Sequence, residues 1–140
     1  MKSLKSIIQV LAFVLITSVT TTAYAGEPTG LFVNLTTNDT KAANKAIMFA
    51  HKVALKRGHS PVAIWLNVNG IHLADEMSVS PALKAKLISF MKDGGIVIAC
   101  RMCSKAAGIT EKDLIKGIKM GNEDMVTGML FNPNVKTLSW

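Results

Sequence analysis

Three short apolar runs, separated by segments of helix length, constrain the fold of this chain more than any other feature. The runs are GLFVNLT (30–36), PVAIWLNV (61–68) and IVIA (96–99). The second is continuous in its hydrophobicity, which is typical of a strand covered on both faces. Strands that alternate with helical segments favour parallel pairing through right-handed crossovers. The sequence therefore predicts one three-layer α/β domain, of the doubly wound kind.

The segment 41–58 has the pattern of the first helix. Ala43, Ile47, Ala50 and Ala54 recur at three- and four-residue spacing, which places them on one face. Gly58 follows two basic residues and is expected to end the helix.

Similar signals complete the domain. Ser80 is expected to cap a helix with Pro81 in its first turn and with Leu83, Leu87 and Phe90 facing inward. After the third strand, a short helix should end at Gly108, and Thr110 should cap a further turn. KGIKM (116–120) is a candidate fourth strand, Asn122 should begin another helix, and VKTLSW (135–140) should form the closing strand.

The first residues have the pattern of a secretory signal peptide. Lys2 and Lys5 precede the uncharged, largely apolar run 7–19, and Ala23 and Ala25 form the A-x-A cleavage pattern. A membrane-spanning helix needs about 20 apolar residues, so an uncleaved anchor is the weaker interpretation. We expect a signal peptide at 1–25, a mature domain at 26–140, a periplasmic location and no membrane attachment after cleavage.

The charge pattern does not indicate a nucleic-acid partner. The net charge is +7, and no run of Lys or Arg forms a basic patch. Such a charge favours solubility and steering of anions, and we expect no nucleic acid to bind an exported protein. The sequence suggests no cofactor.

Polar residues follow each of the three predicted strands. Functional sites in open parallel sheets form at the carboxyl ends of the strands. Asn34 ends the first strand, Asn67 and His72 follow the second, and Cys100 and Cys103 follow the third. We expect these side chains to meet at one rim of the sheet, where Asn34, Asn67 and His72 would orient a small ligand or a partner thiol.

Cys100 and Cys103, the only two cysteines, are expected to be kept for reactivity. A disulfide between them closes a very small loop and stabilises the fold little. Only the thiolate is nucleophilic, and a cysteine of pKa about 8.5 is about 3% ionised at pH 7. Lowering this pKa by about two units needs about 2.7 kcal/mol. A helix that begins at the pair, together with the positive charges of Arg101 and Lys105, would supply it.

Three other interpretations of the pair remain open. The thiols could be inert core residues. They could bind metal, although structural zinc needs four N or S ligands and only His72 could join them, whereas Met102 inside the pair suits copper(I). They could form the C-x-x-C of a thioredoxin-like oxidoreductase, but that motif follows the first strand and begins a long helix. Here it follows the third strand, and Gly108 cuts the helix short.

The order of these segments resembles the DsrE/DsrF-like sulfur-relay family, and its small exported members most closely. The resemblance rests on GLFVNLT, a helix ending KRGH, a strand ending WLNVNG, and then IVIACRMCSKAAGIT. Its most specific part is the cysteine after the third strand with a glycine eight residues later, Cys100 and Gly108. The resemblance implies a flavodoxin-like three-layer α/β/α sandwich with a mainly parallel five-stranded sheet, assembled as a homo-trimer or homo-hexamer.

The resemblance also implies a chemistry. In this family the matching cysteine accepts sulfane sulfur as a persulfide and passes it on, which assigns that role to Cys100. Some members carry a second cysteine where Cys103 stands. We therefore expect a periplasmic sulfur carrier, at most sulfurtransferase-like, whose partners are sulfur donor or acceptor proteins or small sulfur species. The alternatives are a dithiol–disulfide redox protein or sensor and a copper(I)- or zinc-binding protein.

Overall fold

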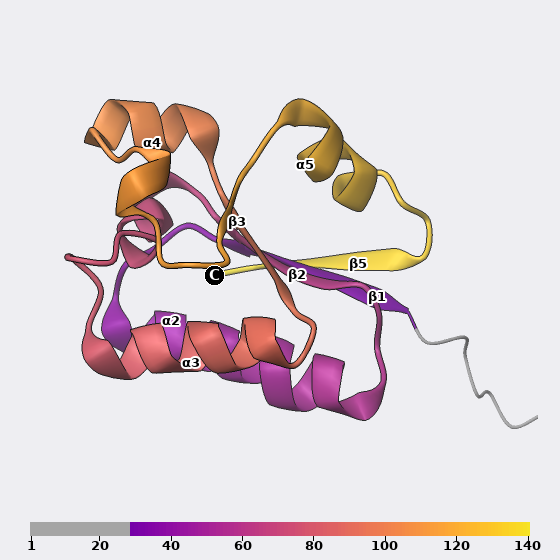
Figure 1. The fold of residues 1–140 in the computed structure, drawn as a ribbon. Helices are drawn as coiled ribbons and strands as arrows, with labels where there is room; N and C mark the ends of the chain where they lie inside the picture. Colours follow the sequence, from indigo (N-terminus) through magenta and orange to yellow (C-terminus); the bar gives the residue numbers. More distant parts are fainter. Residues whose placement is uncertain (1–28) are drawn as a thin grey trace, which may run out of the picture.

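A five-stranded sheet in which all neighbouring strands run parallel forms the centre of the domain (Figure 1). The structure is a computed structural model and describes residues 29–140. The predicted signal peptide, 1–25, and the domain start at residue 26 lie outside the described residues. The strands are β1 (Gly30–Leu35), β2 (Val62–Leu66), β3 (Ile96–Ala99), β4 (Lys119–Met120) and β5 (Val135–Ser139).

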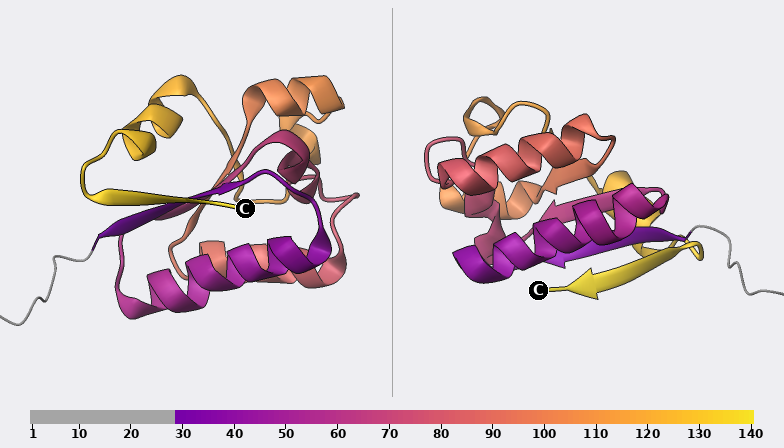
Figure 2. Two further views of the ribbon diagram at one scale, coloured as in Figure 1. Left: turned by 180° about the vertical axis from the view of Figure 1, so that it is seen from behind. Right: turned by 90° about the horizontal axis from the view of Figure 1, so that it is seen from below.

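Helices cover both faces of the sheet. α2 and α3 lie on one side and α5 on the other, with α4 on the same side as α5 at one end of the sheet (Figures 1 and 2). The helices are α2 (Thr40–Met48), which continues as π-helix η1 (Phe49–Ala54) and 3-10 turn η2 (Leu55–Arg57), α3 (Pro81–Lys92), α4 (Arg101–Ala107) and α5 (Glu123–Leu130); the short 3-10 helices are η3 (Val68–Leu73) and η4 (Glu111–Asp113).

This arrangement confirms the predicted three-layer α/β/α sandwich with five strands. The strand order, β4-β3-β2-β1-β5, differs from the 2-1-3-4-5 order of flavodoxin itself. The chain adds β2, β3 and β4 successively on one side of β1, and only β5 returns to the other side. The periodicity of a sequence reports which segments are strands, but it contains no information on this choice of neighbours.

Alternate residues of each strand feed two separate cores, because successive side chains point to opposite faces. The larger core lies against α2 and α3 and includes Val33, Ile64 and Val97. The smaller core lies against α5 and consists of Phe32, Ala63, Ile98 and Val135, with Met125 and Met129 of α5 packed on it. All helix positions predicted to face inward are buried: Ala43, Ile47, Ala50, Ala54, Leu83, Leu87 and Phe90.

The predicted helix ends are confirmed at both termini. Ser80 caps α3, and Asn122 caps α5 by accepting the Met125 N–H at 2.8 Å. Gly58 and Gly108 adopt positive φ angles of 89° and 71° where the first helical segment and α4 end. A glycine takes this left-handed conformation without steric cost, which is why it was expected at these two positions.

The histidine in the first helical segment is a structural residue of the core. His51 is 5% exposed, packs edge-on against Phe90, and its Nε2 lies 2.6 Å from Oδ2 of Asp93. The Lys56 Nζ lies 2.8 Å from the same oxygen. Hydrogen bonds from Lys56 and then His51 hold the pKa of Asp93 below its usual value of 3.8. The cluster ties the first helical segment to the end of α3.

Within residues 29–140, none of the helices combines the length and the apolar character that crossing a membrane requires.

Candidate functional site

Cys100 lies at the carboxyl end of β3, as the sequence indicated. Its backbone N–H donates to the Leu66 carbonyl at 3.0 Å, which continues the hydrogen-bonding pattern between β2 and β3 beyond the strand end. Cys100 is also the N-cap residue of α4, and its Sγ accepts the Cys103 N–H at 3.3 Å. The residue is 6% exposed. The sheet therefore fixes where this sulfur sits.

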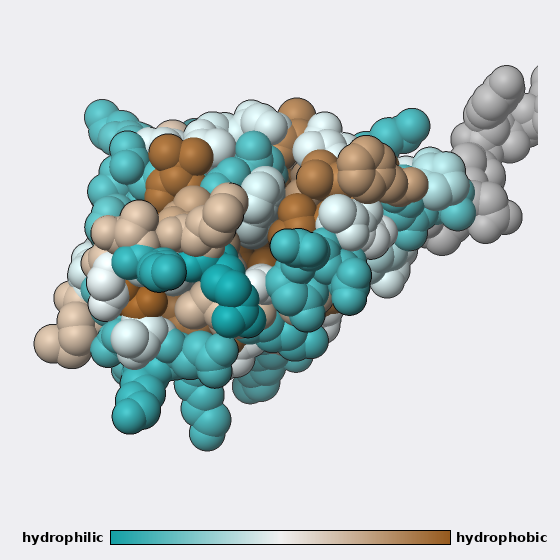
Figure 3. Space-filling model, turned by 90° about the horizontal axis from the view of Figure 1, so that it is seen from above, coloured by the Kyte–Doolittle hydropathy of each residue, from teal (hydrophilic) through white to brown (hydrophobic). Residues whose placement is uncertain are grey.

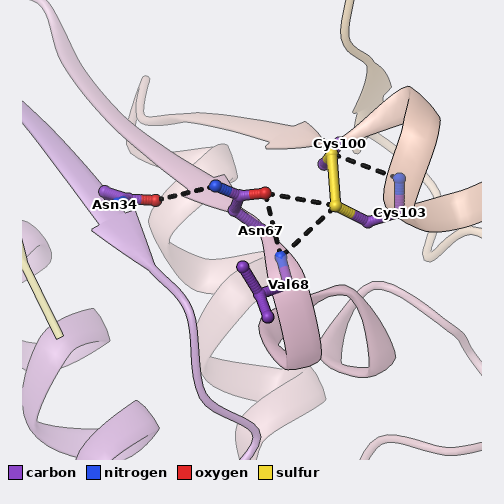
Figure 4. Close-up of a disulfide and its surroundings, with 5 residues drawn as sticks. All are labelled: Asn34, Asn67, Val68, Cys100 and Cys103. Carbon is purple, nitrogen blue, oxygen red and sulfur yellow. Dashed lines mark hydrogen bonds between the residues drawn. A yellow bond between two sulfur atoms is a disulfide. The ribbon is translucent and has the colours of Figure 1, made fainter.

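Cys103 lies one turn further along α4 and forms a disulfide with Cys100, their Cα atoms 5.3 Å apart (Figure 4). Its side chain packs against the larger core, and its sulfur lies beside two polar groups. Its Sγ accepts the Val68 N–H at 3.3 Å and lies 3.1 Å from Oδ1 of Asn67. The contact with Asn67 becomes an S–H···O hydrogen bond only when Cys103 is reduced, because a disulfide sulfur carries no proton.

Asn67 joins the cysteine pair to the sheet. Its backbone N–H donates to the Leu35 carbonyl at 2.9 Å. Its side-chain Oδ1 accepts the Val68 N–H at 2.9 Å, and its Nδ2 donates to Oδ1 of Asn34 at 3.4 Å. Figure 4 shows the resulting chain Asn34–Asn67–Cys103, which connects β1, the end of β2 and α4. Two of the three predicted rim residues therefore do gather with the cysteines.

Val68, which directs its N–H to Cys103, has an unusual backbone. Its φ of +50° places a β-branched residue in the left-handed region, and its side chain is 55% exposed. Such a conformation costs on the order of 1–3 kcal/mol and tends to occur at functional sites. Val68 is not among the residues that the sequence predicts for the site. The only signal was its setting, between Asn67 and the turn-forming pair Asn69–Gly70.

Arg101 and His72, two of the other predicted support residues, line different cavities. Arg101 donates from Nε to the Gly121 carbonyl at 3.0 Å, so its guanidinium leans toward α5. Lys105 is exposed on α4. His72 lies in η3 and lines a different cavity, together with Asn38 and Thr40. Arg101 therefore lines the same cavity as Cys100, whereas His72 does not join the cysteine pair.

An apolar cavity of about 300 Å³ opens beside Cys100. Its walls include Trp65 of β2, Met102 of α4, and Val126 and Thr127 of α5. Seen from the side of α4 and α5, hydrophobic surface is visible near the middle of this face among hydrophilic residues (Figure 3). The two sulfurs thus have different neighbours: an apolar cavity at Cys100 and hydrogen-bonding groups at Cys103.

Trp65 is the wall residue that the sequence analysis missed. Its ring stacks on Phe32 with centroids 6.0 Å apart and an interplanar angle of 17°. Its Nε1 is buried without a hydrogen-bond partner among the described residues. The signal in the sequence was the alternation of side chains along a strand: Trp65 precedes Asn67 by two residues, so the two side chains point to the same face of the sheet.

The donor set around the cysteines is small. Within residues 29–140, no three His, Cys, Asp or Glu side chains come close enough to hold one metal ion. Met102, the third sulfur of the pair's segment, is 81% exposed at the cavity.

A five-stranded parallel sheet with a cysteine pair at the carboxyl end of its third strand places this chain among the α/β sandwich proteins. The comparison with protein families then identifies the chain more closely. It belongs to the DsrE/DsrF-like family, whose model matches residues 30–130. This family is associated with sulfur relay, and the match confirms the resemblance seen in the sequence.

Solved structures share the fold. The YchN protein from E. coli superposes with a TM-score of 0.66 at 12% identity, covering 81% of this chain and 100% of its own. A conserved protein of unknown function from Bacteroides thetaiotaomicron, BT1422, gives 0.60 at 20% identity, covering 79% and 94%. A protein of unknown function from Methanobacterium thermoautotrophicum, MTH1491, gives 0.65 at 12% identity, covering 80% and 99%. A search of curated proteins found no match.

Proposed function

We propose that this protein is a sulfur carrier that holds sulfane sulfur as a persulfide on Cys100. The observation that carries the proposal is the placement of this cysteine: its backbone is bonded to the sheet rim, and its Sγ receives the Cys103 N–H beside an open cavity. An N–H that points at a sulfur favours its negative form, which is the nucleophile. The sulfur-relay association of the family supports the same role.

Cys103 is assigned the release step. Once Cys100 carries a persulfide, the Cys103 thiolate attacks the Cys100 Sγ, a Cys100–Cys103 disulfide forms, and the terminal sulfur leaves as hydrosulfide. An external thiol must then reduce the disulfide before the next cycle. The position of Cys103 supports this assignment, because the two cysteines are already within bonding reach.

The proposal includes a location and an assembly. The signal-peptide pattern at 1–25 supports export to the periplasm, and the association of the family with oligomers supports a homo-trimer or homo-hexamer. Periplasmic fractionation and light scattering at tens of micromolar protein test these two points. Recovery in the cytoplasm would reject the first, and a monomer alone would reject the second.

Intact mass spectrometry tests the carrier role. Reduced protein is incubated with inorganic polysulfide, desalted and weighed, with Cys100→Ser and Cys103→Ser as paired variants. A gain of one sulfur, about 32 Da, is expected in Cys103→Ser but not in Cys100→Ser, whereas the wild type should release the sulfur and end as the Cys100–Cys103 disulfide. If polysulfide loads a control carrier but leaves Cys103→Ser unmodified, the proposal is wrong.

The second candidate is a dithiol–disulfide redox protein or sensor. It is favoured by the Cys100–Cys103 disulfide and by the hydrogen-bonding groups around Cys103. A redox protein would exchange disulfides with protein thiols at a defined potential, whereas the sulfur carrier would gain mass from sulfane sulfur. Both measurements on one preparation separate the two candidates.

A further inference from the structure

The cavity beside Cys100 is suited to a small ligand with an apolar body. Its volume of about 300 Å³ is at the lower end of the range of small-molecule sites. Trp65, Met102 and Val126 give it a mainly apolar lining, and the charged residues Arg101 and Glu123 also line it. The apolar groups bind apolar surface and gain nothing from a heavily hydrated molecule.

The cavity is lined by Cys100 and not by Cys103. Cys100 lines the cavity and is 6% exposed, so the cavity is the route by which a reagent would approach this residue. Cys103 does not line the cavity, and its Sγ contacts Asn67 and the Val68 N–H. The apolar space therefore selects which molecules meet Cys100.

The walls are held in place by independent elements. Arg101 donates to the Gly121 carbonyl, which links the start of α4 to the loop before α5. Asn122 caps α5, and Trp65 is stacked on Phe32 in the sheet. The cavity thus lies between β2, α4 and α5, and each of these elements is held by its own contacts.

We infer that this cavity binds low-molecular-weight organic persulfides with an apolar body, and that these compounds load Cys100. The inference rests on the proposed carrier function and names its donor class. The Cys100 thiolate attacks the outer sulfur of the donor RSSH and forms a new S–S bond. The bond between the two donor sulfurs breaks, and its electron pair leaves with the inner sulfur, which takes up the donor's proton to give RSH. The step involves no net oxidation.

Loading rates with two donors test the inference. Reduced Cys103→Ser protein, which cannot release the bound sulfur, is mixed with benzyl hydropersulfide or with the hydrophilic glutathione hydropersulfide, and the rate of adduct formation is divided by the rate of each donor with free cysteine. We expect a ratio of at least about ten in favour of the benzyl donor, because burying a group of this size in an apolar site favours binding by that order. A ratio near one would overturn the inference.

A pair of variants on α5 locates the effect. Thr127→Phe places a ring in the cavity and should abolish the preference for the benzyl donor. Gly128→Phe is the matched control, because a Cβ at Gly128 meets nothing within 4 Å and this residue does not line the cavity. Retention of the preference in Thr127→Phe, or its loss in both variants, would contradict the assignment.

Fluorescence separates the inference from the carrier function. Trp65 and Trp140 are the only tryptophans, so Trp140→Phe leaves a single reporter in the cavity wall. Benzyl methyl sulfide, which cannot transfer sulfur, should change Trp65 emission saturably in this variant and not after Thr127→Phe is added. If polysulfide transfers sulfur to Cys100 but benzyl methyl sulfide does not bind, the carrier function is retained and the inference about the cavity is wrong. If benzyl methyl sulfide binds but no donor transfers sulfur to Cys100, the proposed carrier function is wrong and the cavity is a binding site without sulfur transfer.

Discussion

Asn67→Ala should make the disulfide harder to reduce. The side-chain Oδ1 of Asn67 lies 3.1 Å from Sγ of Cys103 and can accept its proton only in the reduced protein. The contact therefore stabilises the dithiol relative to the disulfide. The other bond of Oδ1, from the Val68 N–H at 2.9 Å, does not involve the thiol proton, so its loss largely cancels between the two redox states.

The size of the effect follows from the energy of one hydrogen bond. A single intramolecular hydrogen bond contributes about 0.5–1.5 kcal/mol net. For a two-electron couple, about 1.4 kcal/mol corresponds to about 30 mV. Removing the Asn67 side chain should therefore make the reduction potential about 10–30 mV more negative.

The potential is measured by equilibrating the protein with defined ratios of reduced and oxidised dithiothreitol, trapping free thiols with a maleimide and weighing the products. Asn69→Ala is the matched control, because Asn69 is exposed and has no hydrogen bond to the cysteine pair, and its potential should not change. An unchanged potential in Asn67→Ala, or a shift to a less negative value, would refute the reasoning.

Three further variants test the framework around the site. Gly70→Ala would place a Cβ in collision with the Leu35 carbonyl oxygen, so it should lower the free energy of unfolding by about 1–3 kcal/mol or more, whereas Gly128→Ala should not lower it in urea titrations. Asn122→Ala removes the cap of α5 and should cost about 1 kcal/mol, most of which Asn122→Asp should restore. The pKa of Asp93 is lowered in the folded state, chiefly by Lys56, so its stabilising contribution is present above the usual value of 3.8 and is lost as the pH falls through the folded pKa. Urea titrations at pH 5 and pH 3 should therefore show a smaller loss of stability in Asp93→Asn than in the wild type, and an equal loss would contradict this assignment.

The elements of the fold could be predicted because each has a local signal. Ser80 with Pro81, Asn122, Gly58 and Gly108 mark helix ends through hydrogen bonds and backbone angles that depend on the residue type itself. The strand order could not be predicted in the same way, because pairing depends on which edge of the growing sheet each helix returns to.

The candidate site, like the fold, could be predicted only in part. Asn34, Asn67 and the cysteines gather as predicted, because parallel strands bring their carboxyl ends to one edge. His72 does not join them, since η3 turns it toward a different cavity.

Trp65 and Val68 escaped the sequence analysis for different reasons. A tryptophan in a buried strand resembles any other core residue until the cavity beside it is known. A positive φ at a β-branched residue has no signature in composition or spacing, because the surrounding structure imposes it.

The reactivity of Cys100 in Cys103→Ser tests the central claim most directly, by the rate of iodoacetamide alkylation between pH 5 and pH 9. An activated sulfur that is mostly thiolate at pH 7 would be about 25-fold more ionised than free cysteine, and its lower intrinsic nucleophilicity would offset about tenfold of this. We therefore expect a rate about two- to threefold above free cysteine at pH 7, a larger advantage at pH 5.5, and a plateau above pH 8. A rate that stays at or below that of free cysteine and keeps rising to pH 9 would contradict the account.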